Sequence, residues 1–209
     1  MAKPTSHIPE SDVFRVLDLR PSKGDRKKLE IIHAAVDIVG TGKLPTTEAI
    51  AKKLKISTSH VVYYFKDKDE LLLQMIRYVI YLVQRKVVAG LEDNSPWNSQ
   101  LKHFLTATLD WAYEHPGHLI VHYYWFFRAG KSAKYRALHT EFRSFGLKRI
   151  TAILMQQFPH EEAEVRARVI QEFLTGLLVE VGTTQGWKDL SDAKTHAIRS
   201  TEIILGKPL

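Results

Sequence analysis

The feature that most constrains this chain is a helical spacing of apolar residues that recurs along most of its length. Apolar side chains return every three or four positions, as at Leu29, Ile32, Val36 and Val39, whereas the strict alternation of a strand is hard to find. Glycine, proline and small polar residues separate these periodic segments. We therefore predict an all-α fold of about nine helices. The expected helices cover about 23–39, 46–54, 58–64, 68–93, 96–114, 119–127, 134–157, 161–186 and 192–205.

Composition narrows the class of protein. The 209 residues suffice for one large domain or two small ones, and there is no cysteine to form disulfides or thiolate metal sites. No apolar run approaches the roughly 20 residues of a membrane span, and the first ten residues lack the apolar core of a secretory signal. We expect a cytoplasmic protein. A glycine-rich phosphate loop, a nucleophile elbow and paired carboxylates near a histidine are all missing, so we predict no enzyme activity and no cofactor.

The charge balance favours a polyanionic partner. The formal net charge is +7, and residues 23–68 contain ten Lys and Arg against five Asp and Glu. A basic segment of this kind suits nucleic acid, although a solvated basic surface would give the same balance.

Three short helices between residues 23 and 64 carry the most specific pattern. A tight turn at Lys55-Ile56-Ser57 separates the second helix from the third, which is the spacing of a helix-turn-helix. The residues expected to bury together are Ala35, Ile50, Ala51, Leu54, Ile56 and Val61. Their burial leaves the hydroxyl and imidazole side chains of 58–64 on the outer face, flanked by lysines.

Residues 31–72 resemble the DNA-binding domain of the TetR family of transcriptional repressors. The matching segments are Ile31-Ile32-His33-Ala34-Ala35, Thr46-Thr47-Glu48-Ala49-Ile50-Ala51, Ile56-Ser57, Tyr63-Tyr64-Phe65-Lys66 and Lys68-Asp69-Glu70-Leu71. The chain departs from the family pattern at Lys55 and Ser59, where glycine is common, and at Val62, where tyrosine is common. The resemblance implies a repressor that binds a palindromic operator as a homodimer and is released by a small molecule.

The resemblance also assigns the DNA contacts. It implies phosphate contacts for Tyr63, Tyr64, Lys68 and the start of the second helix, and it puts Ser59 and His60 where the family contacts operator bases. Either tyrosine could instead be buried in the packing of the domain. The residues predicted to bind DNA are Thr46, Thr47, Thr58, Ser59, His60, Tyr63, Tyr64, Lys66 and Lys68.

Three parts follow along the chain: an N-terminal arm at 1–22, the helix-turn-helix domain at 23–70, and a ligand-binding and dimerisation domain at 71–209. Aromatic residues crowd the middle of the last part, and most of them should be core. Some should line a cavity for a small apolar or aromatic effector, as the equivalent helices do in the TetR family. The residues predicted to line it are Phe104, Thr108, Trp111, Tyr124, Phe127 and Phe142.

The helix at 161–186 is apolar nearly all round, so it must bury two faces. One face belongs to its own core, and the family's partner for the other is a second subunit, with the last helix completing the interface. The residues predicted at this interface are Phe173, Leu174, Leu177, Leu178, Val181, Ala197, Thr201 and Ile204.

Two alternatives stay open. His118 and His122 stand four residues apart, with His115 before them, so a zinc-responsive regulator is possible. A DNA-binding dimer that responds to no ligand is the other.

Overall fold

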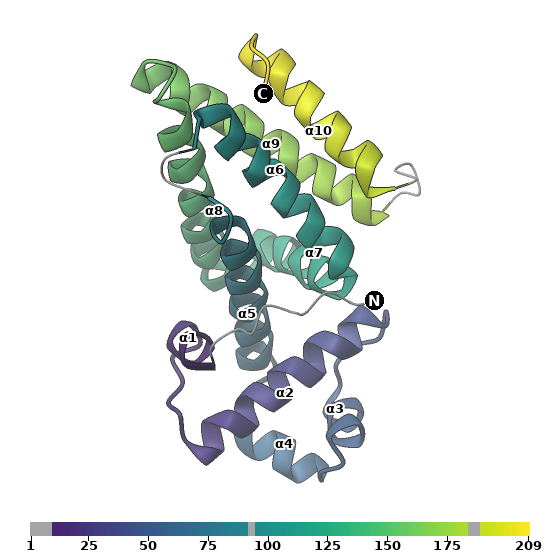
Figure 1. Ribbon diagram of the computed structural model, residues 1–209. Coiled ribbons are helices and arrows are strands. Elements are labelled where there is room, and N and C mark those ends of the chain that lie inside the picture. The colour runs from purple at the N-terminus through teal and green to yellow at the C-terminus, as the bar shows by residue number, and fades with distance from the viewer. Residues whose placement is uncertain (1–9, 92–94, 184–188) are drawn as a thin grey trace. The chain divides into compact units, whose positions relative to one another are not determined.

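The computed structural model describes residues 10–91, 95–183 and 189–209, which form ten α-helices and no strand (Figure 1). The all-helical prediction is confirmed. The tenth helix is α1, which forms inside the segment predicted as an arm. The helices are α1 (Glu10–Val16), α2 (Lys23–Gly40), α3 (Thr47–Leu54), α4 (Thr58–Tyr64), α5 (Lys68–Val88), α6 (Trp97–Glu114), α7 (Pro116–Lys131), α8 (Ala133–Leu154), α9 (His160–Thr183) and α10 (Leu190–Leu205).

The chain divides into two compact units, and the division falls within α5, between Leu82 and Val83. We predicted the boundary after residue 70, which is near the start of the same helix. Two predicted helix ends, at 93 and 186, fall outside the described residues. The helix predicted to reach 93 ends at Val88.

The first unit is built on α2, α3 and α4, which pack against one another around a small apolar core. Ile32, Ala35, Ile50 and Val61 are all buried there, as their spacing predicts. The residues of α1 and the turn after it add to this core, because Val13, Phe14 and Leu17 are buried as well. The described end of the predicted arm is therefore part of the folded unit.

Side-chain caps fix where the three helices of this core begin. Ser22 accepts a hydrogen bond from the backbone N–H of Asp25 at 3.1 Å, and Thr46 accepts one from Ala49 at 3.2 Å. Ser57 accepts one from His60 at 3.2 Å. Each cap satisfies an N–H group that the first turn of a helix leaves without a partner. The caps at Thr46 and Ser57 thereby fix the N-terminal ends of the two short helices α3 and α4.

The second unit consists of the end of α5 together with α6 to α10. Within this unit, α8 packs against α7 and α9. Helix α10 packs against α6 and α9, and Figure 1 shows it running beside these two helices. The largest fully buried side chains are Trp111, Trp125 and Tyr135. Aromatic residues thus form much of the core of this unit, as their number in the sequence predicts.

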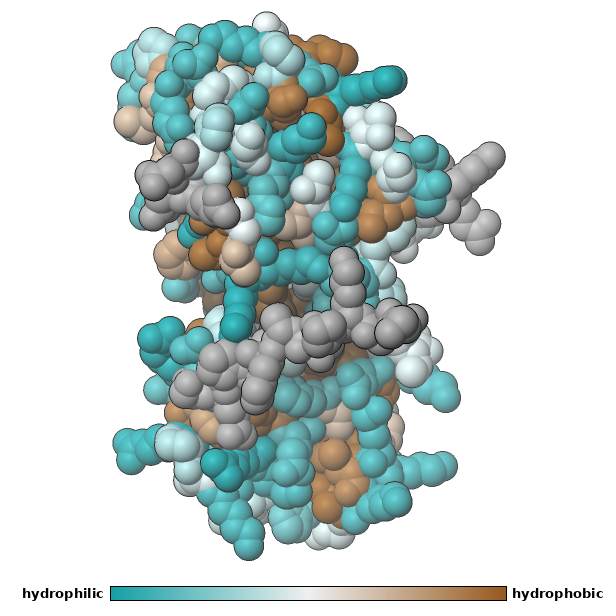
Figure 2. All heavy atoms as spheres, in the orientation of Figure 1, coloured by the Kyte–Doolittle hydropathy of each residue, from teal (hydrophilic) through white to brown (hydrophobic). Residues whose placement is uncertain are grey.

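The face drawn in Figure 2 is mostly hydrophilic, and apolar residues appear on it as small separate patches. None of the helices in the described part of the chain combines the length and apolar character needed to cross a membrane.

Candidate nucleic-acid interface and internal cavity

Helix α4 presents a polar outer face beside the core of the first unit. Val61 is buried and anchors the helix, while Thr58, Ser59 and His60 are exposed on its first turn. The hydroxyl oxygens of Ser57 and Ser59 lie 2.9 Å apart. A short helix held by its buried side and exposed at its N-terminal turn has the geometry with which a recognition helix enters the major groove.

The two tyrosines of α4 have different environments. Tyr63 is 73% exposed, whereas Tyr64 is half-buried, with its ring stacked on that of His60 at 5.5 Å between centroids. The rings of Tyr63 and Tyr64 meet edge to face at 5.1 Å. Burial in the core is therefore excluded for Tyr63, and the ring contacts restrict how His60 and Tyr64 can turn.

The remaining residues predicted to bind DNA surround this face. Thr46 is exposed at the start of α3, although its hydroxyl oxygen already caps that helix, and Thr47 is half-buried. Lys66 and Lys68 are exposed between α4 and α5. The pKa of the fully exposed Glu48 is lowered, first by its hydrogen bond to its own backbone N–H. Contact with DNA remains a prediction for all nine residues.

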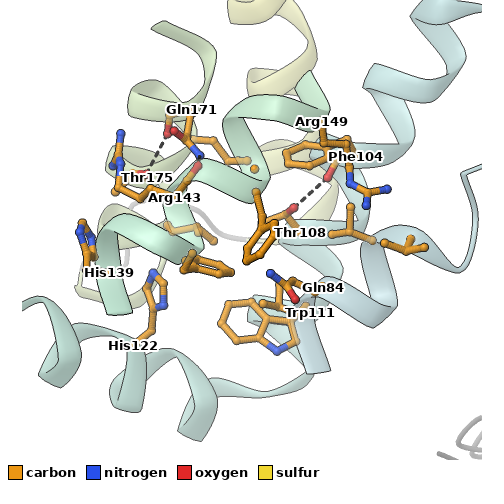
Figure 3. A pocket seen from close by; sticks show the side chains of 18 of the residues that line it. Gln84, Phe104, Thr108, Trp111, His122, His139, Arg143, Arg149, Gln171 and Thr175 are labelled. Carbon is orange, nitrogen blue, oxygen red and sulfur yellow. Dashed lines mark hydrogen bonds between the residues drawn. The ribbon is translucent and has the colours of Figure 1, made fainter. Parts of the chain in front are cut away.

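A cavity of about 200 Å³ lies within the second unit, walled by α5, α6, α7, α8 and α9 (Figure 3). Most of its lining is apolar or aromatic. The lining residues are Val83, Gln84, Val87, Val88, Phe104, Thr108, Trp111, His122, Phe126, His139, Phe142, Arg143, Phe145, Gly146, Arg149, Gln171, Leu174, Thr175 and Leu178. An apolar chamber with a few polar groups is the usual form of a small-molecule site.

Several polar groups of the lining are already occupied with one another. Thr108 Oγ1 donates to the Phe104 carbonyl at 2.8 Å, and Thr175 Oγ1 donates to the Gln171 carbonyl at 2.8 Å. The Gln171 side-chain amide donates to the Arg143 carbonyl at 2.9 Å. Figure 3 shows this group of residues from α8 and α9, with His139, on one side of the cavity.

Both histidines of the lining are held neutral. Burial, with a smaller contribution from the neighbouring His139, lowers the pKa of His122 to about 4. Burial also lowers the pKa of His139, and the Arg143 guanidinium adds to that effect. Neutral imidazoles can donate one hydrogen bond and accept another, but they bring no positive charge.

Four of the six residues predicted to line a cavity do so, namely Phe104, Thr108, Trp111 and Phe142. Tyr124 and Phe127 do not, and Phe127 is 62% exposed. The reason is the rotation of α7 about its axis, which turns His122, Trp125 and Phe126 inward and Tyr124 and Phe127 outward.

Sequence reasoning missed most of the polar lining. On α8 the residues His139, Phe142, Gly146 and Arg149 follow helical spacing along the cavity wall. This stripe mixes charged, aromatic and small residues, so a search for apolar faces does not select it. A glycine in mid-helix, such as Gly146, was the available signal.

The interface prediction also needs correction. Leu174, Leu177, Leu178, Ala197 and Thr201 are buried within the subunit, so they leave no area for a partner, and Leu174 and Leu178 line the cavity. Phe173, Val181 and Ile204 are half-buried. The face of α9 that sequence reasoning assigned to a partner is in part the face that packs on its own core.

The three histidines considered for zinc do not form a metal site in the described part of the chain. His115 and His118 stack at 4.6 Å between ring centroids, but His122 is buried among aromatic rings. No group of three or more His, Cys, Asp or Glu that could hold a metal occurs among the described residues.

Comparison with known proteins agrees with this arrangement. Residues 31–75 match the family model of the bacterial regulatory proteins of the tetR family. No curated protein matches the chain. A transcriptional regulator from Rhodococcus sp. Rha1 superimposes with a TM-score of 0.76 at 16% identity, over 86% of this chain and 96% of that one.

Two further solved structures share the fold. A tetR-family transcriptional regulator from Streptomyces coelicolor gives a TM-score of 0.72 at 16% identity, over 87% of this chain and 81% of that one. A regulator from Saccharomonospora viridis, solved in complex with choline, gives 0.75 at 18% identity, over 85% of this chain and 96% of that one.

The helix-turn-helix and its family match define a DNA-binding transcriptional regulator rather than an enzyme. The match to the tetR family model covers residues 31–75, the helix-turn-helix part of the chain, and the likeness to the solved structures extends over most of the chain and shows a shared fold.

Proposed function

We propose that this regulator is a homodimeric repressor that binds a palindromic operator and is released by a small apolar or aromatic effector in the cavity of the second unit. The observation that carries the proposal is the pairing of a helix-turn-helix with a separate aromatic chamber. Helix α5 belongs to both units, so a ligand against Val83, Gln84 and Val87 contacts the same helix that follows α4.

The release would be a shift between two populations. An effector lowers operator affinity only by the ratio of its affinities for the DNA-incompetent and DNA-competent states. A tenfold ratio corresponds to about 1.4 kcal/mol per site. The choline complex of the Saccharomonospora viridis regulator supports small-molecule binding on this fold, without identifying the effector of this chain.

The DNA side of the proposal is tested by selecting bound sequences from random duplex DNA with the full chain. We expect an inverted repeat whose half-sites stand about one helical turn apart. His60→Ala should relax the preference within each half-site and cost about 1–3 kcal/mol on the selected operator, as expected if the imidazole contacts a base.

Tyr63→Phe is the companion variant, since it removes one exposed hydroxyl from the same helix. It should weaken binding to operator and to unrelated DNA by similar factors if that hydroxyl holds a phosphate. Unchanged affinity of both variants at fixed salt would show that another face of the unit binds DNA.

The ligand side is tested by filling the cavity. Thr108 is buried in its wall, so Thr108→Trp should remove ligand binding and leave operator binding intact. A chain whose operator affinity responds to no small molecule, before or after this change, would instead be a ligand-independent DNA-binding dimer.

The dimer proposal is supported by a row of exposed apolar side chains on α9. Positions spaced by four and three residues line one side of a helix. On α9 this spacing connects Val165, Val169, Glu172, Gly176 and Val179, all of which are exposed. Ile203 of the neighbouring α10 is 82% exposed. Apart from its chain neighbours and the nearby backbone of α9, no described atom lies within 4 Å of a Cβ placed on Gly176, so another helix has room to approach there.

A further inference from the structure

The charges around the cavity are all of one sign. Of its nineteen lining residues only Arg143 and Arg149 carry a full charge, because His122 and His139 are neutral, and none of the nineteen is Asp or Glu. Within the described part of the chain, neither guanidinium forms an ion pair, although the same unit pairs Lys86 with Glu114 and Lys194 with Asp110. The chamber is therefore positively biased.

The two arginines differ in their surroundings. Arg143 is half-buried, and its backbone carbonyl is tied to Gln171 of α9, so its place on the wall is fixed by two helices. Arg149 is exposed and lies on the opposite side of the cavity in Figure 3. A half-buried guanidinium without an anionic partner is costly, and an anion that enters offsets that cost.

The neutral polar atoms of the wall leave the recognition of charge to the arginines. The hydroxyls of Thr108 and Thr175 already donate to backbone carbonyls. Trp111 Nε1 and His139 Nε2 have no hydrogen-bond partner among the described residues, but both atoms are buried and expose almost no surface to the cavity. The two guanidinium groups are therefore the donors of the wall best suited to bind an anionic ligand.

The size and lining of the cavity define the rest of the ligand. A cavity of about 150 Å³ lined by apolar residues admits benzene, and this one measures about 200 Å³. Phe104, Trp111, Phe126 and Phe142 supply the aromatic surface. One ring with a short side chain, or a medium-length alkyl chain, fits that space.

We propose that the effector is an amphipathic anion, an apolar or aromatic body bearing a carboxylate, and that Arg143 is the residue that binds the carboxylate. A planar guanidinium matches a carboxylate with two parallel hydrogen bonds. Cations of the same shape are excluded by two unpaired arginines and by the lack of any acid in the lining. This inference rests on the proposed function, because it takes the cavity as the effector site.

The test compares probes that share a body and differ in charge. Phenyl, naphthyl and n-octyl compounds are each titrated as carboxylate, alcohol and primary amine into the full chain, by calorimetry and by tryptophan fluorescence. We expect at least one carboxylate to bind ten or more times more tightly than its alcohol, and its amine to bind more weakly than either.

Three variants assign that preference to a residue. Arg143→Gln should lower affinity for the carboxylate tenfold or more and leave that for the alcohol within about twofold, and Arg143→Lys should retain part of the preference. Arg136→Gln removes the same charge from an exposed position of α8 outside the cavity, so it should bind as the unchanged chain does. Circular dichroism checks that each variant is folded.

The inference is overturned if amines bind as well as carboxylates, if Arg143→Gln leaves the carboxylate preference intact, or if no carboxylate of the three bodies binds. Operator binding is measured separately on the same samples. A carboxylate that binds through Arg143 yet leaves operator affinity unchanged would uphold this inference and contradict the proposed release mechanism.

Discussion

Lys55 occupies the left-handed region of backbone conformation, with φ of 55° and ψ of 43°, at the turn between α3 and α4. A residue with a Cβ pays about 1–2 kcal/mol to stay there, whereas glycine does not. The backbone N–H of Lys55 still closes α3 by bonding to the carbonyls of Ala51 and Lys52. The chain therefore carries a strained lysine at the one turn that sets the angle between these two helices.

We predict that Lys55→Gly raises the free energy of unfolding by about 0.5–1 kcal/mol, once the greater flexibility of glycine in the unfolded chain is deducted. Urea denaturation measures the change. Lys52→Gly is the matched control, since it removes the same side chain from the interior of α3 and should lower stability by about 1 kcal/mol. If both variants changed the free energy of unfolding in the same direction, the turn at Lys55 would not be the source of the strain.

His122 is buried among the rings of Trp111, Trp125, Phe126 and Phe142. Its pKa is lowered to about 4 from an ordinary value of 6.5. Between these two pH values the unfolded chain binds the proton and the folded chain does not, so protonation favours unfolding. The contribution of this histidine to stability is present above pH 6.5 and is lost as the pH falls toward 4.

We therefore predict that unfolding free energy falls between pH 7 and pH 4.5, and that His122→Phe removes up to about 3 kcal/mol of that fall. Denaturation at both pH values gives the difference. His160→Asn removes an exposed imidazole outside the cavity and should keep the original pH dependence. An equally steep fall in the His122→Phe chain would contradict the assignment.

Helix α7 shows what a sequence pattern can and cannot fix at the scale of an element. The sequence predicts a helix at 119–127, and α7 does form there, but it begins earlier, at Pro116, and ends later, at Lys131. Pro116 stands in its first turn, where the missing N–H costs nothing. Its rotation does not follow, because apolar residues cover nearly its whole circumference. A search for helical spacing treats Tyr124 and Trp125 alike, because both are aromatic. In the structure, however, Tyr124 is exposed and Trp125 is fully buried.

The same limit explains the cavity and the interface. Helices α2, α3 and α4 each have one apolar stripe, so most of their buried residues were predicted correctly, although Leu54 and Ile56 are half-buried. Helix α9 has apolar residues on several sides, and only packing against α8 and α10 decides that Leu177 faces inward and Val169 outward. Arg143 and Gln171 meet through a tertiary hydrogen bond that no local pattern contains.

The rotation of α7 yields a direct prediction. Trp125 is fully buried, and its Nε1 donates to the Tyr135 carbonyl at 3.3 Å, so Trp125→Ala should cost about 3–5 kcal/mol. Phe127→Ala on the exposed face of the same helix should cost less than about 1 kcal/mol. Thermal or urea unfolding of the two variants measures both effects, and similar losses would show that α7 is rotated otherwise.

At the scale of the whole molecule, the proposed function requires two chains acting together. Two recognition helices must stand about 34 Å apart to enter successive major grooves, which one chain with one α4 cannot achieve. The exposed valines of α9 and Ile203 of α10 offer an apolar surface for a second copy of the chain. Exposed apolar side chains arranged in a row, rather than scattered singly, are typical of a surface that binds a partner.

We predict that Val169→Glu, or Ile203→Glu, yields monomers whose affinity for a two-half-site operator falls at least a hundredfold. Each change puts an acid into the proposed seam, where two copies would face each other near the symmetry axis. Sedimentation velocity measures assembly, and a titration with a single half-site shows whether α4 still binds DNA. Thr140→Glu, on an exposed position of α8, is the matched control and should stay dimeric. If the seam variants sediment as the unchanged chain does, another surface joins the subunits, whereas loss of half-site binding would mean that the first unit itself was damaged.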